Sequence, residues 1–407
     1  MNIHRIPFLR IGSVVVFAFA LTSLLASCKQ ANTAVDPGSN QPGTPVNTSI
    51  PKSPGAIVDP VDNPSSPAKI ELGRHLFYDK SLSVDGSTSC GSCHDVGSGL
   101  ADKRGLATSM GFENQMGIRN APALANVAFN TSFTWDGKFA SLEAHAQGPI
   151  FNSLEMGNNF SIDGRDSTGN TDTVGSGYNS KPGPHDTLFL FKRLNGRPGD
   201  LNGKSYPDMF IAAWGSADIS MDRIAKSIAA FERTFISTQS TFDKYNNGDA
   251  SVLKYNPEAI HGLQLFTDVN GANCISCHSG YNFTDQQFHD NGIGITSTIN
   301  RQTADKGRSA VTKKSSDDYA FKTPTLRNIA LTGPYMHDGR YTSLDQVLAN
   351  YRNGGQGTPN QDPRITKIKS ANLSDQDVAD IISFLKTLTD NPFVTDKTGK
   401  LSNPWGD

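Results

Sequence analysis

The 407-residue sequence predicts a mainly α-helical protein with long loops and an internal duplication. Apolar residues recur at helical spacing in 220–235 and 374–388, and no sustained alternation of apolar and polar residues indicates a sheet. Two segments share one order of residues ahead of a cysteine pair: Pro67, Ile70, Gly73, Leu76, Phe77 and Asp79, then Pro257, Ile260, Gly262, Leu265, Phe266 and Asp268. We therefore expect two similar helical domains in tandem.

The first 66 residues are expected to lie outside these domains. Two arginines precede an apolar run over 11–26 that is too short to span a bilayer comfortably, and Cys28 follows it. This pattern resembles a bacterial lipoprotein signal, cleaved before Cys28 and acylated on its sulfur; the alternative is an ordinary signal peptide with a discarded cysteine. Both predict export. Lys29 favours the outer membrane of a Gram-negative bacterium, with the protein facing the periplasm.

The expected boundaries follow the duplication. They are a signal peptide over 1–27, a flexible tether rich in proline and small polar residues over 28–66, a first domain over 67–240, a second over 241–390 and a tail over 391–407. Ser374 is a candidate N-cap with Asp377 at N3, and Val378 to Leu388 form the apolar face of a closing helix. The polar, glycine-rich stretch 158–203 is predicted to be a long loop.

Each expected domain carries one C-x-x-C-H motif, the attachment signature of c-type haem. Two thiols with two residues between them reach two vinyl groups, and the adjacent histidine reaches the iron. A disulfide, a zinc site or a redox dithiol are the alternatives, but none needs a histidine directly after each second cysteine. We predict two covalently bound haem c groups, attached through Cys90, Cys93, Cys274 and Cys277, with His94 and His278 as proximal ligands.

The charge balance argues against some partners. Lys and Arg number 37 against 39 Asp and Glu, a formal net charge of −2, without runs of like charge. This pattern gives no electrostatic footprint for nucleic acid or for adhesion to an anionic membrane.

Further motifs resemble those of the bacterial di-haem cytochrome c peroxidase superfamily, which includes the MauG-type enzymes. The resemblance covers about 67–388 and implies a peroxide site at the N-terminal haem, an electron relay at the C-terminal haem, and Trp135 between them. By itself, Trp135 would be a core aromatic. The motifs are Arg119-Asn120-Ala121-Pro122, Trp135-Asp136-Gly137, Glu155-Met156-Gly157, Ala230-Phe231-Glu232-Arg233-Thr234, Thr323-Pro324-Thr325-Leu326-Arg327-Asn328 and Pro334 to Gly339.

The resemblance also places the second axial ligand of the relay haem at Tyr351. This ligand is a methionine in the cytochrome c peroxidases and a tyrosine in MauG-type members. Helical spacing independently puts Tyr351 on the buried stripe of a helix that starts near Ser343, together with Leu344, Val347 and Leu348. Met336 is the alternative ligand.

At the peroxide haem, Phe112 stands where the resemblance expects a displaceable histidine, so this iron is expected to stay five-coordinate. Glu155 matches a glutamate that moves protons during peroxide cleavage. His145 stands where a glutamine is expected, and its protonation would make activity pH-dependent near neutrality. Without the resemblance, neither residue needs a catalytic role, and His145 would be a surface histidine at the end of a helix. A rival hypothesis is a non-enzymatic electron carrier, which needs Met110 or Met116 as a sixth ligand.

The resemblance further implies a calcium ion between the domains, bound by the side chain of Asn120 and the carbonyls of Thr332 and Pro334. It implies hydrogen peroxide as substrate. The electrons would come from a small cytochrome c or cupredoxin, or from an oxidisable residue of a partner protein. The other histidines are expected to be structural or exposed: His75, His185, His261 and His289.

Overall fold

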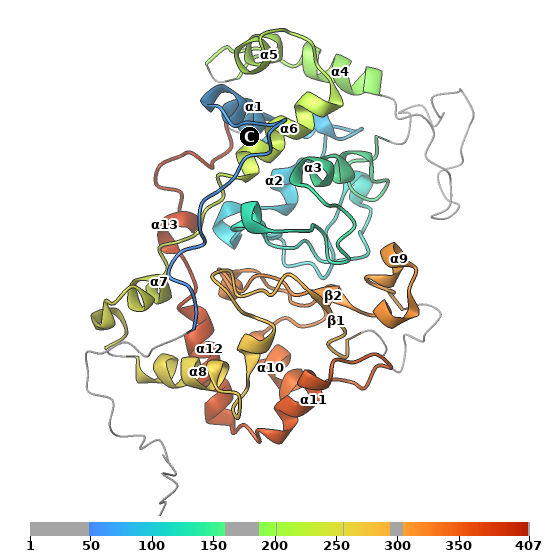
Figure 1. Cartoon of the computed structure of the whole chain (residues 1–407). Coiled ribbons are helices and arrows are strands. Elements are labelled where there is room, and N and C mark those ends of the chain that lie inside the picture. Colours follow the sequence, from blue (N-terminus) through green and yellow to red (C-terminus); the bar gives the residue numbers. More distant parts are fainter. Residues whose placement is uncertain (1–48, 159–186, 201, 255, 294–303, 406–407) are drawn as a thin grey trace, which may run out of the picture. The chain divides into compact units, whose positions relative to one another are not determined.

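The computed structural model describes residues 49–158, 187–200, 202–254, 256–293 and 304–405, which belong to one compact unit. The expected signal peptide, Cys28, most of the expected tether and His185 lie outside these ranges. Helices make up most of the regular structure there, as predicted (Figure 1). None of these helices has the length and apolar character needed to cross a bilayer.

The helices run along the chain in two groups. The first comprises α1 (Pro67–Tyr78), α2 (Cys90–Cys93), α3 (Leu142–Phe151), α4 (Thr187–Gly196), α5 (Tyr206–Trp214) and α6 (Met221–Glu232). The second comprises α7 (Thr241–Asn246), α8 (Pro257–Thr267), α9 (Ser309–Thr312), α10 (Leu344–Arg352), α11 (Pro363–Ser370), α12 (Asp375–Lys386) and α13 (Asn391–Val394). The sheet found in the described ranges is one antiparallel pair, β1 (Phe288–His289) with β2 (Phe321–Lys322), in which His289 lies opposite Phe321.

Local sequence explains where the main helices begin. Prolines open α1 and α8, where a missing backbone N–H costs nothing, and Ser66 and Asn256 cap them. Ser374 caps α12, and its Oγ accepts a hydrogen bond from the N–H of Asp377, as predicted. Ser343 caps α10 in the same way.

A helix pair that crosses at a glycine lies at the centre of each domain. α1 packs on α6, and α8 packs on α12. A Cβ atom on Gly73 would lie 1.9 Å from the carbonyl oxygen of Ser227, and one on Gly262 would lie 1.9 Å from that of Asp380. Only glycine permits so close an approach. The glycines of the sequence duplication therefore mark equivalent helix crossings.

Each helix pair closes over its own hydrophobic core. Aromatic rings meet edge to face in both cores: the ring centroids of Phe77 and Phe231 lie 5.5 Å apart, and those of Phe266 and Phe384 lie 5.1 Å apart. Leu72, Leu76 and Ile228 also belong to the first of these cores, and Leu263, Phe283 and Leu388 also belong to the second.

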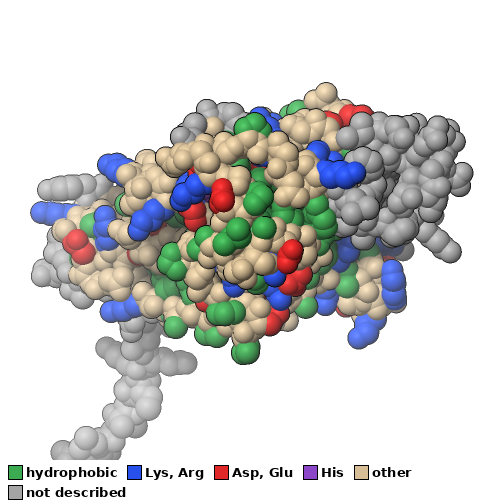
Figure 2. All heavy atoms as spheres, turned by 90° about the horizontal axis from the view of Figure 1, so that it is seen from above, with side chains coloured by type: hydrophobic (Ala, Val, Ile, Leu, Met, Phe, Trp, Pro, Cys, Tyr) green, Lys and Arg blue, Asp and Glu red, His purple; other side chains and the backbone are tan. Residues whose placement is uncertain are grey.

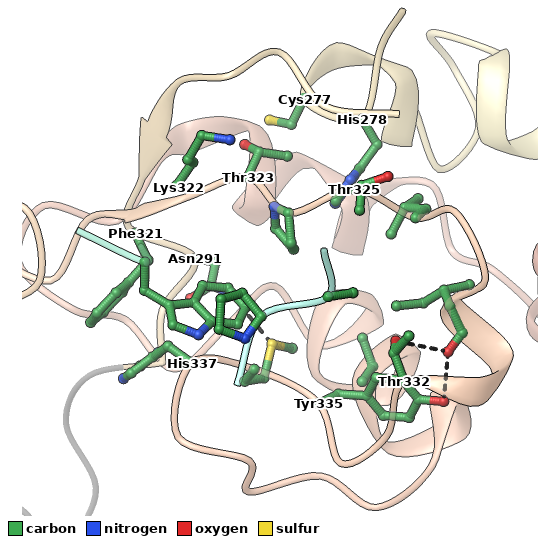
Figure 3. A pocket seen from close by; sticks show the side chains of 18 of the residues that line it. Cys277, His278, Asn291, Phe321, Lys322, Thr323, Thr325, Thr332, Tyr335 and His337 are labelled. Carbon is green, nitrogen blue, oxygen red and sulfur yellow. Dashed lines mark hydrogen bonds between the residues drawn. The ribbon is translucent and has the colours of Figure 1, made fainter. Parts of the chain in front are cut away.

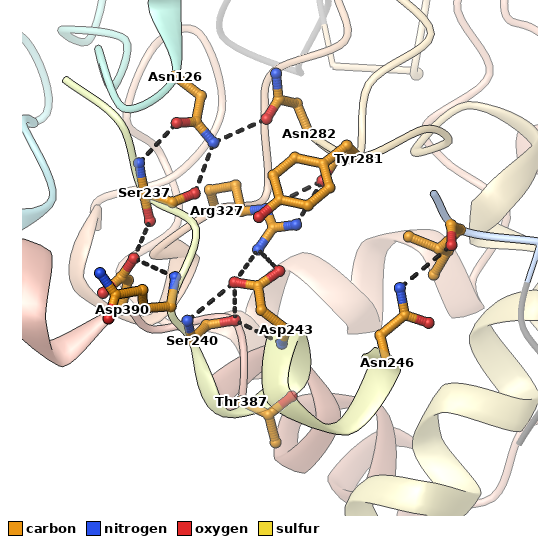
Figure 4. Close-up of polar contacts among 12 residues, drawn as sticks. Asn126, Ser237, Ser240, Asp243, Asn246, Tyr281, Asn282, Arg327, Thr387 and Asp390 are labelled. Atoms are coloured by element: carbon orange, nitrogen blue, oxygen red, sulfur yellow. Dashed lines mark hydrogen bonds and ion pairs between the residues drawn. The ribbon is translucent and has the colours of Figure 1, made fainter. Parts of the chain in front are cut away.

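Polar side chains are buried where the two halves meet (Figure 4). Asn126, which belongs to the first half, donates from Nδ2 to the Ser237 carbonyl and to Asn282 Oδ1, both at 2.9 Å. Arg327 is fully buried, and its Nη1 lies 2.6 and 2.7 Å from the two carboxylate oxygens of Asp243. Arg327 and Asp243 both belong to the second half, so their ion pair stabilises that half, whereas the hydrogen bond from Asn126 to Asn282 joins the two halves.

Two stretches are more structured than predicted. Helix α4 lies within 158–203, where only a loop was expected. The last part of the expected tether is also packed: Ile50 is buried in the second core, and Asn63 donates from Nδ2 to Glu143 Oε1 at 2.8 Å. Short apolar stretches in a polar context carry too weak a pattern to be recognised from sequence.

The chain after residue 390 returns to the first half. Phe393 and Leu401 are buried in the first core, and Trp405 packs against it. Trp405 Nε1 donates to the His75 carbonyl at 3.0 Å, and the Arg197 guanidinium lies 3.9 Å from the centroid of the Trp405 ring. The expected tail is therefore an integral part of the fold.

Candidate functional site

Each half contains a cavity lined by its C-x-x-C-H motif. We call first cavity the one lined by Cys90, Cys93 and His94, and second cavity the one lined by Cys274, Cys277 and His278. All four cysteines are free thiols in the structure, so neither pair forms a disulfide.

Both motif histidines are oriented by a backbone carbonyl. His94 Nδ1 lies 2.9 Å from the Leu100 oxygen, and His278 Nδ1 lies 3.0 Å from the Phe283 oxygen. Each Nδ1 therefore carries the proton, which leaves Nε2 unprotonated. Burial lowers the pKa of both imidazoles, so they are neutral, as metal ligands must be. A histidine held in this way fits an axial ligand of haem iron.

The two residues whose carbonyls accept these hydrogen bonds share an unusual backbone conformation that sequence analysis missed. Leu100 has φ of 65° and Phe283 has φ of 54°, in the left-handed region that bulky residues rarely adopt. Such strain costs on the order of 1–3 kcal/mol and persists only where surrounding structure enforces it. Its recurrence beside both histidines indicates a shared need to aim a carbonyl at Nδ1. Both sites therefore fit a covalently attached haem in the cysteines and the histidine of the motif, and also in the backbone carbonyl that orients each histidine.

Glu155 lies in the wall of the first cavity and is held from two sides. Asn152 Nδ2 donates to Glu155 Oε1 at 2.6 Å, and the backbone N–H of Phe112 donates to the Glu155 carbonyl at 2.8 Å. Burial raises the pKa of the Glu155 carboxyl, because desolvation disfavours its charged form. A carboxyl with a raised pKa and a fixed position can exchange a proton with a ligand in the cavity.

His145 also lines the first cavity, but it differs from the prediction. Its ring stacks on Phe133 with centroids 5.6 Å apart, and its Nδ1 has no hydrogen-bond partner among the described residues. Burial lowers the pKa of His145 to about 4. The expected titration near neutrality is therefore wrong, because the imidazole is already neutral there.

Two methionines line the first cavity, Met110 and Met156, and Met110 is one of the two predicted as a sixth ligand. Met110 lines the cavity, whereas Met116 is 46% exposed on the outer side of the same loop. Phe112 is buried away from the cavity wall, with its ring against Gly157. Another carboxyl in this wall, Glu232, has an Oε2 atom with no hydrogen-bond partner among the residues that the structure describes, and burial raises the pKa of Glu232 to about 8.

The second cavity, where His278 and Asn291 lie (Figure 3), also brings together both predicted axial ligands. Tyr351 on α10 and Met336 line it together with His278. Burial raises the pKa of Tyr351 to about 12, while a hydrogen bond from Asn291 acts in the opposite direction. Asn291 Nδ2 also lies 3.7 Å from Met336 Sδ. Asn291 was not singled out from the sequence, because no motif includes it.

Trp135 is held by both halves of the protein. Its Nε1 donates to the Asn120 carbonyl at 2.8 Å, and its own carbonyl accepts from the N–H of Lys322 at 2.8 Å. Asn120, Thr332 and Pro334, the expected calcium ligands, line the second cavity together with Trp135. His145 lines both cavities, so the wall between them runs through this region.

Other charged groups stand around the second cavity. Lys322 is buried in its wall, and desolvation lowers the pKa of its ammonium to about 8. His289, expected to be structural or exposed, lies in the cavity wall, 2.8 Å from Asp285 and 3.0 Å from Asp362. His75 and His261 instead pair with Asp200 and Asp380.

The face seen in Figure 2 carries basic and acidic side chains interspersed, with apolar side chains among them. This mixed distribution is consistent with the near-zero net charge.

The fold and the two sites define a class of protein. The family model described as di-haem cytochrome c peroxidase matches residues 67–251, and the one described as cytochrome c matches residues 259–389. The chain belongs to the di-haem cytochrome c peroxidase family. It is therefore an oxidoreductase of the cytochrome c peroxidase type, whose two domains imply two haem c groups.

The relatives of this chain include both MauG proteins and cytochrome c peroxidases. The methylamine utilization protein MauG of Methylorubrum extorquens is 34% identical over 95% of this chain and 96% of its own length. Cytochrome c551 peroxidase of Pseudomonas aeruginosa is 32% identical over 80% of each chain. Among solved structures, a MauG-like protein associated with microbial copper homeostasis is 29% identical, with a TM-score of 0.72 over 88% of this chain and 99% of that one.

Proposed function

We propose that this protein reduces hydrogen peroxide at a haem in the first cavity, with electrons relayed through a haem in the second cavity from an oxidisable residue of a partner protein. The observation that carries the proposal is the asymmetry of the two cavities. The first contains a carboxyl held in place by Asn152, that of Glu155, whereas the second contains the phenol of Tyr351.

The haem supplies the redox chemistry, and the side chains supply protons and geometry. Reduction of one peroxide to two waters consumes two electrons and two protons. Glu155 accepts a proton from peroxide and returns it to the departing oxygen, while the Asn152 amide keeps its carboxyl in place. Neutral His145 contributes hydrogen bonding and the shape of the cavity, and carries no charge.

Electrons would travel between the cavities by way of Trp135. Its indole N–H and its carbonyl are both hydrogen-bonded, so the ring has one orientation between the halves. Tyr351 is proposed as the second axial ligand of the relay haem, with Met336 as the alternative. A calcium ion held by Asn120, Thr332 and Pro334 would stiffen the same region, because the Asn120 carbonyl also holds Trp135.

The source of electrons distinguishes two forms of this proposal. Tyr351, and Phe112 in place of a histidine, favour a MauG-type oxidation of a protein partner. A small cytochrome c or cupredoxin as donor is the other form, and the resemblance to the cytochrome c551 peroxidases supports it. We also propose acylation at Cys28 and a periplasmic location, which rest on the N-terminal pattern alone.

Electron paramagnetic resonance of the ferric protein tests the central proposal. One high-spin and one low-spin haem are expected, and Tyr351→Phe should alter the low-spin signal only. A low-spin signal untouched by Tyr351→Phe would remove Tyr351 as ligand and favour Met336. Steady-state assays with reduced cytochrome c and with candidate partner proteins then separate the two forms.

The presence of Met110 in the first cavity favours one second candidate, a non-enzymatic electron carrier with two six-coordinate irons. It requires two low-spin signals in the ferric protein. In that case Met110→Leu would convert one of them to high spin, whereas the same substitution in a peroxidase would leave the high-spin signal in place.

A further inference from the structure

Asn291 reaches both candidate ligands of the second cavity. It lies two residues after the end of β1, and its side chain enters the cavity (Figure 3). The amide Nδ2 donates to Met336 Sδ at 3.7 Å, and a hydrogen bond from the same side chain opposes the rise that burial causes in the pKa of the Tyr351 phenol. Its Oδ1 is buried and has no partner among the described residues. The donor half of the amide is therefore engaged, and the acceptor half is not.

The backbone on either side of Asn291 is fixed. His289 is paired with Phe321 in the sheet, and the Asp290 carboxylate accepts hydrogen bonds from Thr358 Oγ1 at 2.6 Å and from the Gly292 N–H at 2.9 Å. Gly292 has φ of +78°, and a Cβ atom there would lie 2.4 Å from Gln361 Oε1. The strand and the glycine leave the Asn291 side chain little freedom to withdraw.

The segment that anchors Asn291 is also tied to the helix that carries Tyr351. Thr358 and Gln361 belong to the loop 354–362, which follows α10, and the Asp362 N–H donates to the Asp290 carbonyl at 2.8 Å. The same loop is closed onto α10 by the Gly355 N–H, which donates to the Asn350 carbonyl at 3.0 Å. Hydrogen bonds therefore connect the segment that carries Asn291 to the helix that carries Tyr351, and they restrain the distance between the amide and the phenol.

We propose that Asn291 is a positioning residue that selects the phenolate oxygen of Tyr351 over the sulfur of Met336 as axial ligand. This inference rests on the proposed ligation by Tyr351. A hydrogen bond to an anionic oxygen is short and strong, whereas a thioether is only a weak acceptor. An N–H donor shared between the two therefore stabilises the phenolate more, and it restrains the sulfur within the cavity wall.

A purely structural role for Asn291 explains less. A buried amide kept for packing alone would satisfy its oxygen as well as its nitrogen, because an orphaned acceptor opposes folding. Here the oxygen has no partner within the described ranges, whereas the N–H side contacts Met336 and acts on the pKa of Tyr351.

Substitution of Asn291 in the full-length, haem-loaded protein tests the proposal. Asn291→Leu keeps the size and removes the donor, and Asn291→Asp keeps the shape but replaces the donor with an acceptor. The readouts are the electron paramagnetic resonance of the low-spin haem and its ligand-to-iron charge-transfer absorption. We expect a second low-spin species with thioether ligation in both variants, in a larger fraction in Asn291→Asp, and its loss in Asn291→Leu/Met336→Leu.

Two further variants separate the possible failures. Asn130→Leu, at an asparagine that lines the same cavity and contacts Gln286, should keep the wild-type spectrum. If Tyr351→Phe changes the low-spin signal but both Asn291 variants keep the wild-type spectrum, the selection by Asn291 is refuted while ligation by Tyr351 stands. If Tyr351→Phe leaves the wild-type signal, ligation by Tyr351 fails, and the inference fails with it.

Discussion

Gly262→Ala is expected to destabilise the second half, although alanine is the better helix former. The added Cβ would lie 1.9 Å from the Asp380 oxygen and 2.4 Å from the Asp380 carbonyl carbon, both backbone atoms of α12. Relief requires α8 and α12 to separate by more than 1 Å, because ordinary contacts of this kind begin near 3.4 Å. Overpacking of this kind costs about 1–3 kcal/mol, and this overlap with rigid backbone belongs at the upper end of that range.

The gain in helix propensity offsets only part of that loss. Replacing glycine with alanine inside a helix contributes about 1 kcal/mol, which leaves a net destabilisation of about 2 kcal/mol. For a domain of this size each kcal/mol lowers Tm by roughly 2–4 °C, so a decrease of about 4–8 °C is expected.

Thermal unfolding of the haem-loaded protein, followed by circular dichroism, measures this effect. Gly196→Ala is the matched control, because it lies in α4 and a Cβ there meets no atom within 4 Å. The control should be neutral or slightly stabilising. A Tm of Gly262→Ala equal to or above that of the wild type would refute the close helix crossing as the reason for the duplicated glycine.

Three other changes have defined outcomes. Glu155→Gln, which keeps the size but cannot transfer the proton, should lower kcat for peroxide reduction by about 10²–10⁴-fold, and a stopped-flow rate equal to the wild type would exclude Glu155 as the acid–base group. Glu232 has a pKa raised by burial from 4.5 to about 8, so the native state holds an extra proton between these values and stability falls as pH rises through that window, by up to about 1.4 kcal/mol per pH unit. Glu232→Gln should flatten this part of the curve in urea titrations at several pH values, and an unchanged slope would show that Glu232 is ionised in the native state. Trp405→Ala should lower the free energy of unfolding by about 2 kcal/mol, since it removes a partly buried indole and its hydrogen bond to the His75 carbonyl; an unchanged denaturation midpoint would mean that the C-terminal segment does not stabilise the first half.

Features set by neighbouring residues could be predicted from the sequence. The capping of α12 by Ser374 and the inward stripe that carries Tyr351 follow from helical spacing, which involves only residues a few positions apart. The haem attachment motifs are likewise contiguous. The duplication of Gly73 and Gly262 was visible as a pattern, although its cause was not.

Tertiary structure decided the features that join distant segments. The strained carbonyls of Leu100 and Phe283 follow no motif, because their task is defined by the orientation of a histidine ring in space. The pKa of His145 depends on burial by Phe133 and its neighbours, which its sequence position does not report. Asn291 meets Tyr351 only because β1 and the loop after α10 pack together. Local spacing fixes which side chains lie on the same face of one element, but packing between elements fixes which of them share a cavity, and the chemistry of this protein depends on the second.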